Sequence, residues 1–330
     1  MASRIFTNKV ALLIFSLLIL ISLYEFNPFS NSSREVEEKR PNILLILADD
    51  LGYSDIAPFG GEISTPNLDA LAAGGIKMSN LYAASACSPT RSMLLGGASS
   101  HRAGMGTMYN DQTPNQLGQP GYEGYLNNDV VTVSTLLKDA GYHTYMTGKW
   151  HLGYEDDQSA HARGFEKSFS LLQGGGHHFD DAPMTVDHDT SWYRENGVRT
   201  ELPEDFFSTK FYTDKIIEYI NEDKEDGKPF FAYLAYTAPH WPLQAPKEYI
   251  DKYEGKYDAG YNALTQQRLQ SMKDLGIVRS DLDAPVPVYP KSENWDNLSD
   301  EQKKTEAREM EIYAAMVENM DFHIGRILSY

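Results

Sequence analysis

The sequence predicts an α/β fold built on a mostly parallel sheet with helices on both faces. Three observations predict this class. A continuous apolar run is typical of a strand buried on both faces, helical and strand-like segments alternate along the chain, and a polar cluster follows each predicted strand. With 330 residues, 41% of them hydrophobic, the chain is long enough to bury a large core.

The individual elements follow from apolar periodicity and from glycine and proline at their ends. In chain order we expect a strand at Asn42–Ala48, a helix in "STPNLDALAAGGIK" capped by Thr65 and stopped by Gly74 and Gly75, a helix in "CSPTRSMLLGG", a helix in "VVTVSTLLKDAG" closed by Gly141, a strand at Tyr142–Thr147, an amphipathic helix in "KFYTDKIIEYINEDKEDG", a strand at Pro229–Tyr236, and a helix at Thr305–Leu328.

Polar side chains follow the three predicted strands. Asp49 and Asp50 come after the first, Lys149 and His151 after the second, and His240 after the third. Because parallel sheets bind ligands outside the carboxyl ends of their strands, these side chains are expected to share one site.

Each polar cluster alone has a plainer interpretation. The adjacent acids Asp49 and Asp50 are consistent with a hard-cation site or with a cap for the next element. Lys149 and His151 point the same way in an extended segment, so a cation and a titratable imidazole would serve one pocket. His240, between two prolines, is also consistent with a loop residue without a chemical role.

Cys87 is the single cysteine of the chain. A disulfide within the chain and a zinc site built on thiolates are therefore excluded, which leaves packing, a nucleophile, or a precursor of another group. With Pro89 in the first helical turn, Cys87 would lie at a helix N-terminus, where backbone N–H groups favour anions. Arg91 adds a positive charge one turn further on.

The charge balance excludes one class of partner. The chain has 29 Lys and Arg against 47 Asp and Glu, a formal net charge of −18, so it lacks the basic footprint that nucleic-acid binding needs. An anionic substrate would require a local cationic pocket.

The N-terminus predicts export. Arg4 and Lys9 precede the apolar run Val10–Leu23, so residues 1–24 are expected to be a signal peptide or an uncleaved anchor that tethers the chain to a membrane, followed by a linker at residues 25–40. Either alternative places the protein in the periplasm or outside the cell.

Four ordered segments resemble the sulfatase family. "CSPTR" with "SMLLGG" is similar to the first sulfatase signature, C-x-P-x-R, although Gly96 departs from the usual residue there, and "GYHTYMTGKWH" is similar to the second. "NILLILADDLG" and "PHWPLQAP" resemble the metal-binding and histidine segments. The resemblance covers residues 41–330, is nearest to bacterial-type arylsulfatases, and implies the alkaline-phosphatase-like fold.

The resemblance implies a mechanism and a role for each residue. A maturase would convert Cys87 to formylglycine in the unfolded chain, and the hydrated aldehyde would attack a sulfate ester. The implied metal ligands are Asp49, Asp50 and Cys87, for calcium in preference to magnesium. Arg91 would orient the nucleophile, Lys149 would hold sulfate, His151 would accept a proton, and His240 would bind sulfate and protonate the leaving oxygen.

Family members complete the metal site with a later Asp-Asn pair and a further lysine, and neither occurs here. We therefore expect an N-terminal portion of a longer sulfatase that is inactive alone. Two other functions stay open: a phosphonate monoester hydrolase or phosphodiesterase of the same superfamily, and a non-catalytic sulfate-binding protein. The glycine-rich segment Gln173–Pro183 would either line the substrate side of the pocket or form a mobile surface loop.

Overall fold

One six-stranded sheet organises the part of the chain that the computed structural model describes, namely residues 40–185, 189–284 and 294–330. The order is β1-β6-β2-β3-β4-β5. Neighbouring strands from β1 to β3 pair in parallel, and the last two pairings are antiparallel. The strands are β1 (Ile43–Leu47), β2 (His143–Lys149), β3 (Lys167–Leu171), β4 (Tyr193–Glu195), β5 (Val198–Thr200) and β6 (Phe230–Ala235). The mostly parallel sheet predicted from the sequence is confirmed.

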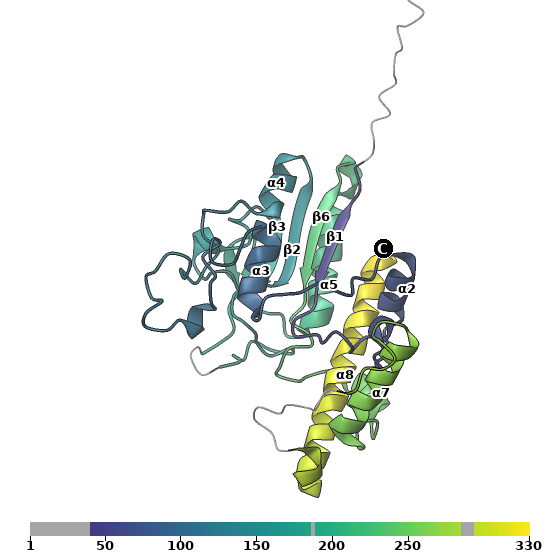
Figure 1. Ribbon diagram of the computed structural model, residues 1–330. Helices are drawn as coiled ribbons and strands as arrows, with labels where there is room; N and C mark the ends of the chain where they lie inside the picture. The colour runs from purple at the N-terminus through teal and green to yellow at the C-terminus, as the bar shows by residue number, and fades with distance from the viewer. Residues whose placement is uncertain (1–39, 186–188, 285–293) are drawn as a thin grey trace, which may run out of the picture. The chain divides into compact units, whose positions relative to one another are not determined.

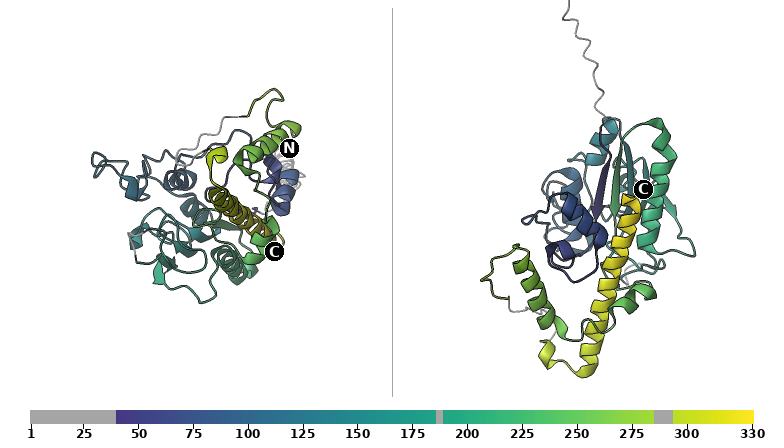
Figure 2. Two further views of the ribbon diagram at one scale, coloured as in Figure 1. Left: turned by 90° about the horizontal axis from the view of Figure 1, so that it is seen from below. Right: turned by 90° about the vertical axis from the view of Figure 1, so that its right-hand side faces the viewer.

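Helices cover both faces of this sheet (Figure 1). Helices α3 and α4 lie on one face, and α5 packs on the other against β2 and β6. The long helix α8 packs between α2 and α5, as Figure 2 also shows. The helices are α2 (Pro66–Gly74), α3 (Cys87–Gly96), α4 (Val133–Asp139), α5 (Ser208–Asp223), α6 (Lys247–Ile250), α7 (Gly260–Asp274) and α8 (Asp300–Leu328).

Two cores explain why the central strands are apolar throughout. In β1, Leu44 and Ile46 pack into the core beneath α5 and α8, whereas Ile43, Leu45 and Leu47 pack into the core beneath α3 and α4. Alternate side chains of a strand point to opposite faces, so a strand between two helical layers needs apolar residues at every position.

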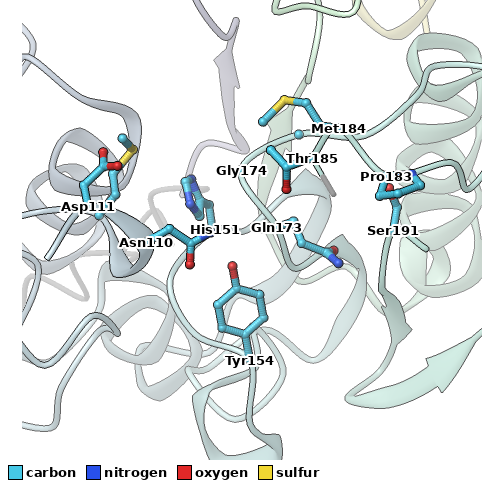
Figure 3. Close-up of a pocket in the computed structure, with 12 residues that line it drawn as sticks. Asn110, Asp111, His151, Tyr154, Gln173, Gly174, Pro183, Met184, Thr185 and Ser191 are labelled. Atoms are coloured by element: carbon cyan, nitrogen blue, oxygen red, sulfur yellow. The ribbon is translucent and has the colours of Figure 1, made fainter. Parts of the chain in front are cut away.

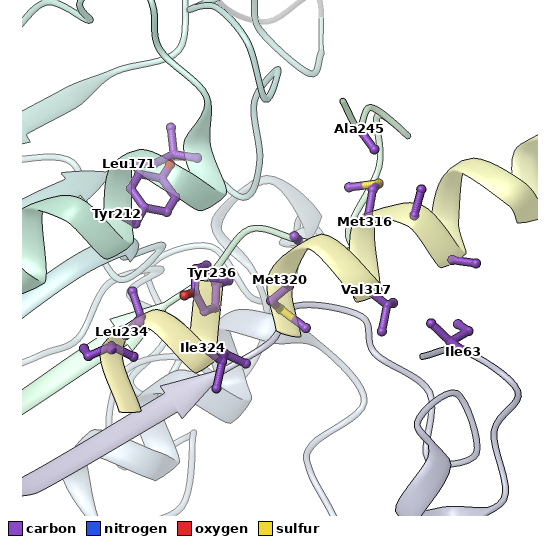
Figure 4. Close-up of a cluster of buried hydrophobic side chains, with 14 of the residues drawn as sticks. Ile63, Leu171, Tyr212, Leu234, Tyr236, Ala245, Met316, Val317, Met320 and Ile324 are labelled. Carbon is purple, nitrogen blue, oxygen red and sulfur yellow. The ribbon is translucent and has the colours of Figure 1, made fainter. Parts of the chain in front are cut away.

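Helix α8 supplies much of the first of these cores. Met316, Val317, Met320 and Ile324 are buried along one stripe of the helix. Figure 4 shows Met320 and Ile324 near Tyr236 and Leu234, whereas Met316 lies towards Ala245 and Val317 towards Ile63. Ser299 caps the helix: its hydroxyl accepts from the Gln302 N–H, and the Gln302 side chain accepts from the Ser299 N–H. The helix therefore begins five residues earlier than the sequence predicted.

Every predicted helix and strand is present, but besides the earlier start of α8 one capping assignment was wrong. Thr65 occupies the position before α2, but its hydroxyl does not accept a hydrogen bond from the first turn of the helix. It accepts from the Ala57 N–H at 3.3 Å and donates to the Asp69 carboxylate at 3.0 Å. The preceding loop therefore takes the oxygen that the sequence assigned to capping.

The predicted signal or anchor at residues 1–24 and most of the linker lie outside the described residues. Within the described ranges, no helix is both long enough and apolar enough to cross a membrane.

Candidate active site

The three polar clusters predicted at strand ends meet at one edge of the sheet. Strands β1, β6 and β2 are parallel neighbours, so their carboxyl ends point in the same direction. Lys149 is the last residue of β2, and Asp49 lies two residues beyond β1. The Asp49 N–H donates to the Ala238 carbonyl at 3.1 Å, which joins the loop after β1 to the loop that carries His240.

Asp49 is the centre of a buried group of charges. Arg91 Nη2 lies 3.0 Å from one carboxylate oxygen of Asp49, and Lys149 Nζ lies 2.5 Å from the other. The exposed fractions of Asp49, Arg91 and Lys149 are 3%, 1% and 0%. Burial alone would raise the pKa of Asp49, but the charges of Arg91 and Lys149 lower it overall. Two buried cations thus share one carboxylate, which leaves a local excess of positive charge.

Arg91 is fixed by more than its ion pair. Its Nη1 donates to the Lys149 carbonyl at 2.8 Å and lies 3.4 Å from the Tyr233 hydroxyl. The side chain therefore links α3 to β2 and β6.

Cys87 is the first residue of α3 and is partly exposed. Its Sγ lies 3.2 Å from His151 Nδ1 and 3.6 Å from Met108 Sδ. Burial, followed by the charges of Lys149 and Arg91, lowers the pKa of His151 well below its ordinary value. The imidazole is therefore neutral near pH 7 and able to accept a proton beside residue 87.

Two site residues have a backbone conformation that side chains rarely adopt. Asp50 has φ +62° and His151 has φ +54°. This left-handed region costs a non-glycine residue on the order of 1–2 kcal/mol. Such conformations concentrate at functional sites, where the surrounding structure enforces them.

His240 lies between the acids after β1 and a second buried histidine. Its Nε2 is 3.4 Å from the Asp50 carboxylate, and its Nδ1 donates to the Trp241 carbonyl at 2.6 Å. His178 Nε2 donates to the His240 carbonyl at 3.1 Å, so His178 Nδ1 accepts from the Ser208 hydroxyl at 2.7 Å. Burial lowers the pKa of His178 to about 4. A neutral His178 therefore anchors the His240 loop to the start of α5.

The glycine-rich segment Gln173–Pro183 lines a pocket beside His151 (Figure 3). Its backbone passes so close to the imidazole that a Cβ on Gly174 would lie 2.7 Å from His151 Cε1. Contacts below 3.0 Å require a shift, so glycine is needed there for space. Of the two alternatives left open by the sequence, the segment lines the pocket.

The predicted metal ligands do not form a metal centre by themselves. Across the described residues, no group of three His, Cys, Asp or Glu side chains is arranged to hold a metal ion. Both carboxylate oxygens of Asp49 are bonded to cations, and Asp50 is largely exposed. The assignment of Asp49, Asp50 and Cys87 as ligands stays a prediction.

Sequence reasoning placed every candidate residue at this edge but missed its supporting residues. Tyr233, His178 and Met108 each contact a predicted site residue, and Tyr154 lines the pocket. Of these residues only His178 had a signal in the sequence. It is one of two adjacent histidines in "GGGHH", within the glycine-rich segment that was a candidate to line the pocket.

Comparisons with known proteins agree with this geometry. The family model described as sulfatase matches residues 41–330. An uncharacterized sulfatase of Schizosaccharomyces pombe is 46% identical over 319 residues, covering 90% of this chain and 55% of the relative. An arylsulfatase of Klebsiella aerogenes is 43% identical over 302 residues, covering 91% of this chain and 64% of the relative.

A solved structure gives the same fold. The crystal structure of Ps i-CgsB matches with a TM-score of 0.62 and 25% identity, covering 88% of this chain and 54% of that chain. This chain therefore spans little more than half the length of the proteins to which it is similar.

Proposed function

The chain belongs to the sulfatase family, and from that premise we propose that it hydrolyses sulfate esters of aryl or related alcohols. One observation carries the proposal: two fully buried cations, Arg91 and Lys149, share the single carboxylate of Asp49 beside Cys87. The surplus positive charge lies at the N-terminus of α3, where backbone N–H groups also favour an anion. A sulfate group meets both requirements.

We propose a role for each residue, which its position supports. Arg91 and Lys149 would bind the sulfate oxygens and stabilise the charge that develops during transfer. Neutral His151 would accept a proton at residue 87, to which it is already close. His240 would donate a proton to the alcohol oxygen as the bond from that oxygen to sulfur breaks. When Cys87 is converted to formylglycine, it supplies the hydrated aldehyde that attacks sulfur.

We propose a calcium ion as the metal cofactor, with Asp49 and Asp50 among its ligands. When bound, it would polarise the sulfate oxygens. Calcium takes six to eight oxygen ligands, and the described residues hold no group of three suitable side chains. The roles proposed above for Arg91, Lys149, His151 and His240 are therefore argued from these side chains and do not depend on the ion.

We further propose that residues 1–24 carry the chain out of the cytoplasm, as a cleaved signal or as an anchor, and that a maturase modifies Cys87. Expression in a maturase-competent host, followed by mass spectrometry of the Cys87 peptide, tests both proposals. The expected result is the mass loss of conversion to formylglycine in exported protein, with Cys87→Ala as the control. An unmodified thiol would overturn the mechanism.

Binding of inorganic sulfate tests the pocket charge independently of turnover. Lys149→Met keeps the Arg91–Asp49 pair balanced but removes the surplus charge, so we expect at least about tenfold weaker sulfate binding by calorimetry, for a loss near 1.4 kcal/mol. Lys138→Met, on exposed α4, is the matched control. Unchanged sulfate affinity in Lys149→Met contradicts the proposed anion site.

Paired titrations with an aryl sulfate and an aryl phosphodiester distinguish the phosphodiesterase alternative, for which the diester would bind more tightly.

A further inference from the structure

A pocket of about 330 Å³ opens beside the reacting residue. Two of its lining residues contact the Cys87 thiol directly: His151 through Nδ1 at 3.2 Å and Met108 through Sδ at 3.6 Å. Cys87 does not itself line the pocket but contacts two residues that do. The pocket is thus adjacent to the proposed sulfate site. The volume is near the lower end of the range of about 300–1,000 Å³ for small-molecule pockets.

One side of the pocket is aromatic and apolar. The Tyr154 ring projects into the pocket in Figure 3 and is held edge-on by Tyr109, with ring centres 5.5 Å apart, and by Trp192 at 5.9 Å. Met108 and Met184 add polarizable thioethers to the same lining. Figure 3 places Met184 across the pocket from Tyr154, so a flat apolar group of single-ring size would meet an aromatic ring on one side and a thioether on the other.

The charge of the pocket is opposite to that of the sulfate site. No lysine or arginine occurs among the described residues that line it. Its one carboxylate is Asp111, at an exposed position. The amide of Gln173 is already bonded, because its oxygen accepts from the Trp192 N–H at 2.7 Å and its nitrogen donates to the Thr190 carbonyl at 3.2 Å. A second anionic group would find no cation here and would meet Asp111.

We propose that this pocket binds the alcohol part of the sulfate ester and selects an uncharged single-ring group over one that carries a further sulfate or carboxylate. Tyr154 is the specificity-determining residue for the ring, and Asp111 is the residue that disfavours a second anion. The inference rests on the proposed function in one respect only, namely that the sulfate group is bound beside Cys87.

Four probes separate the two sites when titrated into the full chain with Cys87 unconverted. Inorganic sulfate reports the sulfate site, phenol reports the ring pocket alone, and phenyl sulfate reports both. Glucosamine 2,6-disulfate supplies the second anion. Phenol binding is read from saturation-transfer NMR and the anions from calorimetry. The variants are Tyr154→Ala, Tyr154→Phe as the conservative change, and Asp111→Asn. Asp139→Asn, an exposed change on α4, is the matched control for charge.

We expect phenyl sulfate to bind about tenfold more tightly than inorganic sulfate, and Tyr154→Ala to remove this gain while Tyr154→Phe keeps it. The disulfate should bind no more tightly than inorganic sulfate, and Asp111→Asn should improve only the disulfate, by a few-fold, because an exposed charge is screened. Absence of phenol binding, an unchanged ratio in Tyr154→Ala, or tighter binding of the disulfate than of phenyl sulfate overturns the proposal. Phenol binding that persists without any sulfate binding would instead count against the proposed function.

Discussion

Strand β2 has a polar cluster at each end, and the two clusters combine histidine, lysine and acid to opposite effect. The amino-end cluster consists of His143, Glu166, Lys167, Asp223 and Asp226. The carboxyl-end cluster consists of Asp49, Arg91, Lys149 and His151. Acids outnumber lysine and arginine in the first. In the second, two buried cations, Arg91 and Lys149, face one buried acid, Asp49, while Asp50 is largely exposed.

The two histidines respond to these surroundings in opposite directions. Burial alone would lower the pKa of His143, but hydrogen bonds to Asp226 and Glu166 raise it overall. Burial and two neighbouring cations lower the pKa of His151. A histidine bonded to acids looks like a catalytic pair, yet here it lies at the solvent-facing end. The comparison shows that burial and the sign of the surplus charge, rather than the number of ion pairs, distinguish the candidate site.

We expect the largest effect from removing the negative charge of Asp49 in the cluster at the carboxyl end of β2. Asp49→Asn leaves two buried cations without a carboxylate, so we expect a loss of about 3–5 kcal/mol in the free energy of unfolding. Glu166→Gln at the amino end should cost less, about 1 kcal/mol, because its ion pair with His143 is partly exposed. Urea unfolding of both variants measures the difference.

A rescue keeps this prediction testable if Asp49→Asn does not fold. The double variant Asp49→Asn with Lys149→Met removes one of the two stranded cations, so it should recover soluble, cooperatively unfolding protein. Equal losses for Asp49→Asn and Glu166→Gln would show that burial does not separate the two clusters.

We expect the free energy of unfolding to fall at acidic pH because of His178, near the carboxyl end of β2. The ordinary pKa of 6.5 applies to the unfolded chain, whereas the folded value is about 4. Between these values only the unfolded state takes up the proton, so stability is lost as pH falls from 6.5 towards 4, by on the order of 3 kcal/mol. Unfolding of His178→Asn between pH 7.5 and 4.5 should show a smaller loss than the parent chain. His161→Gln, at an exposed position, should keep the parent's slope, and an equal slope in His178→Asn would refute the assignment.

Adding a methyl group at position 174 tests whether the glycine-rich segment Gln173–Pro183 must pass close to His151. Gly174→Ala places a methyl group against His151, so we expect a loss of about 1–3 kcal/mol in stability together with weaker sulfate binding. Gly74→Ala is the matched control, because a Cβ there meets no atom within 4 Å. Crystal structures or His151 NMR shifts of the two variants would locate the displacement, and an undisturbed His151 in Gly174→Ala would refute it.

The smallest expected effect comes from His143. Its raised pKa means that its stabilising contribution is complete below pH 6.5 and is lost as pH rises through the higher folded value. Because the cluster is open to solvent, the loss should not exceed about 1 kcal/mol. His143→Gln should remove this alkaline dependence in urea unfolding. If instead His143→Gln lost stability on the scale of Asp49→Asn, the contrast between the two ends would fail.

The predictable part of the molecule is the part governed by local pattern. Apolar runs between glycine and proline located β1, β2 and β6, and the rule for parallel strands then brought Asp49, Lys149 and His240 to one edge. Strands β3, β4 and β5 and helices α6 and α7 were not predicted. Strands β4 and β5 have three residues each, too few to show a period. Thr65 was misassigned because its hydroxyl accepts instead from the N–H of Ala57, the first residue of a short 3-10 helix (Ala57–Phe59) that was not predicted.

The supporting residues escaped prediction for a different physical reason. Tyr233 is one apolar-type residue among six in β6, and its contact with Arg91 spans 142 residues. The role of His178 depends on Ser208 and on a carbonyl 62 residues away. Such roles arise from tertiary packing and leave no local signal.

The long separation between Arg91 and Tyr233 also sets a minimum time during protein synthesis before Arg91 can be buried. Arg91 cannot reach its buried position until Tyr233, 142 residues further along, has been added to the chain. At about 5–20 residues per second, translation needs roughly 7–28 s for that stretch. Throughout this interval the segment around Cys87 has no completed sheet on which to pack. Under the modification proposed above, the order of strands along the chain would leave Cys87 accessible for this time.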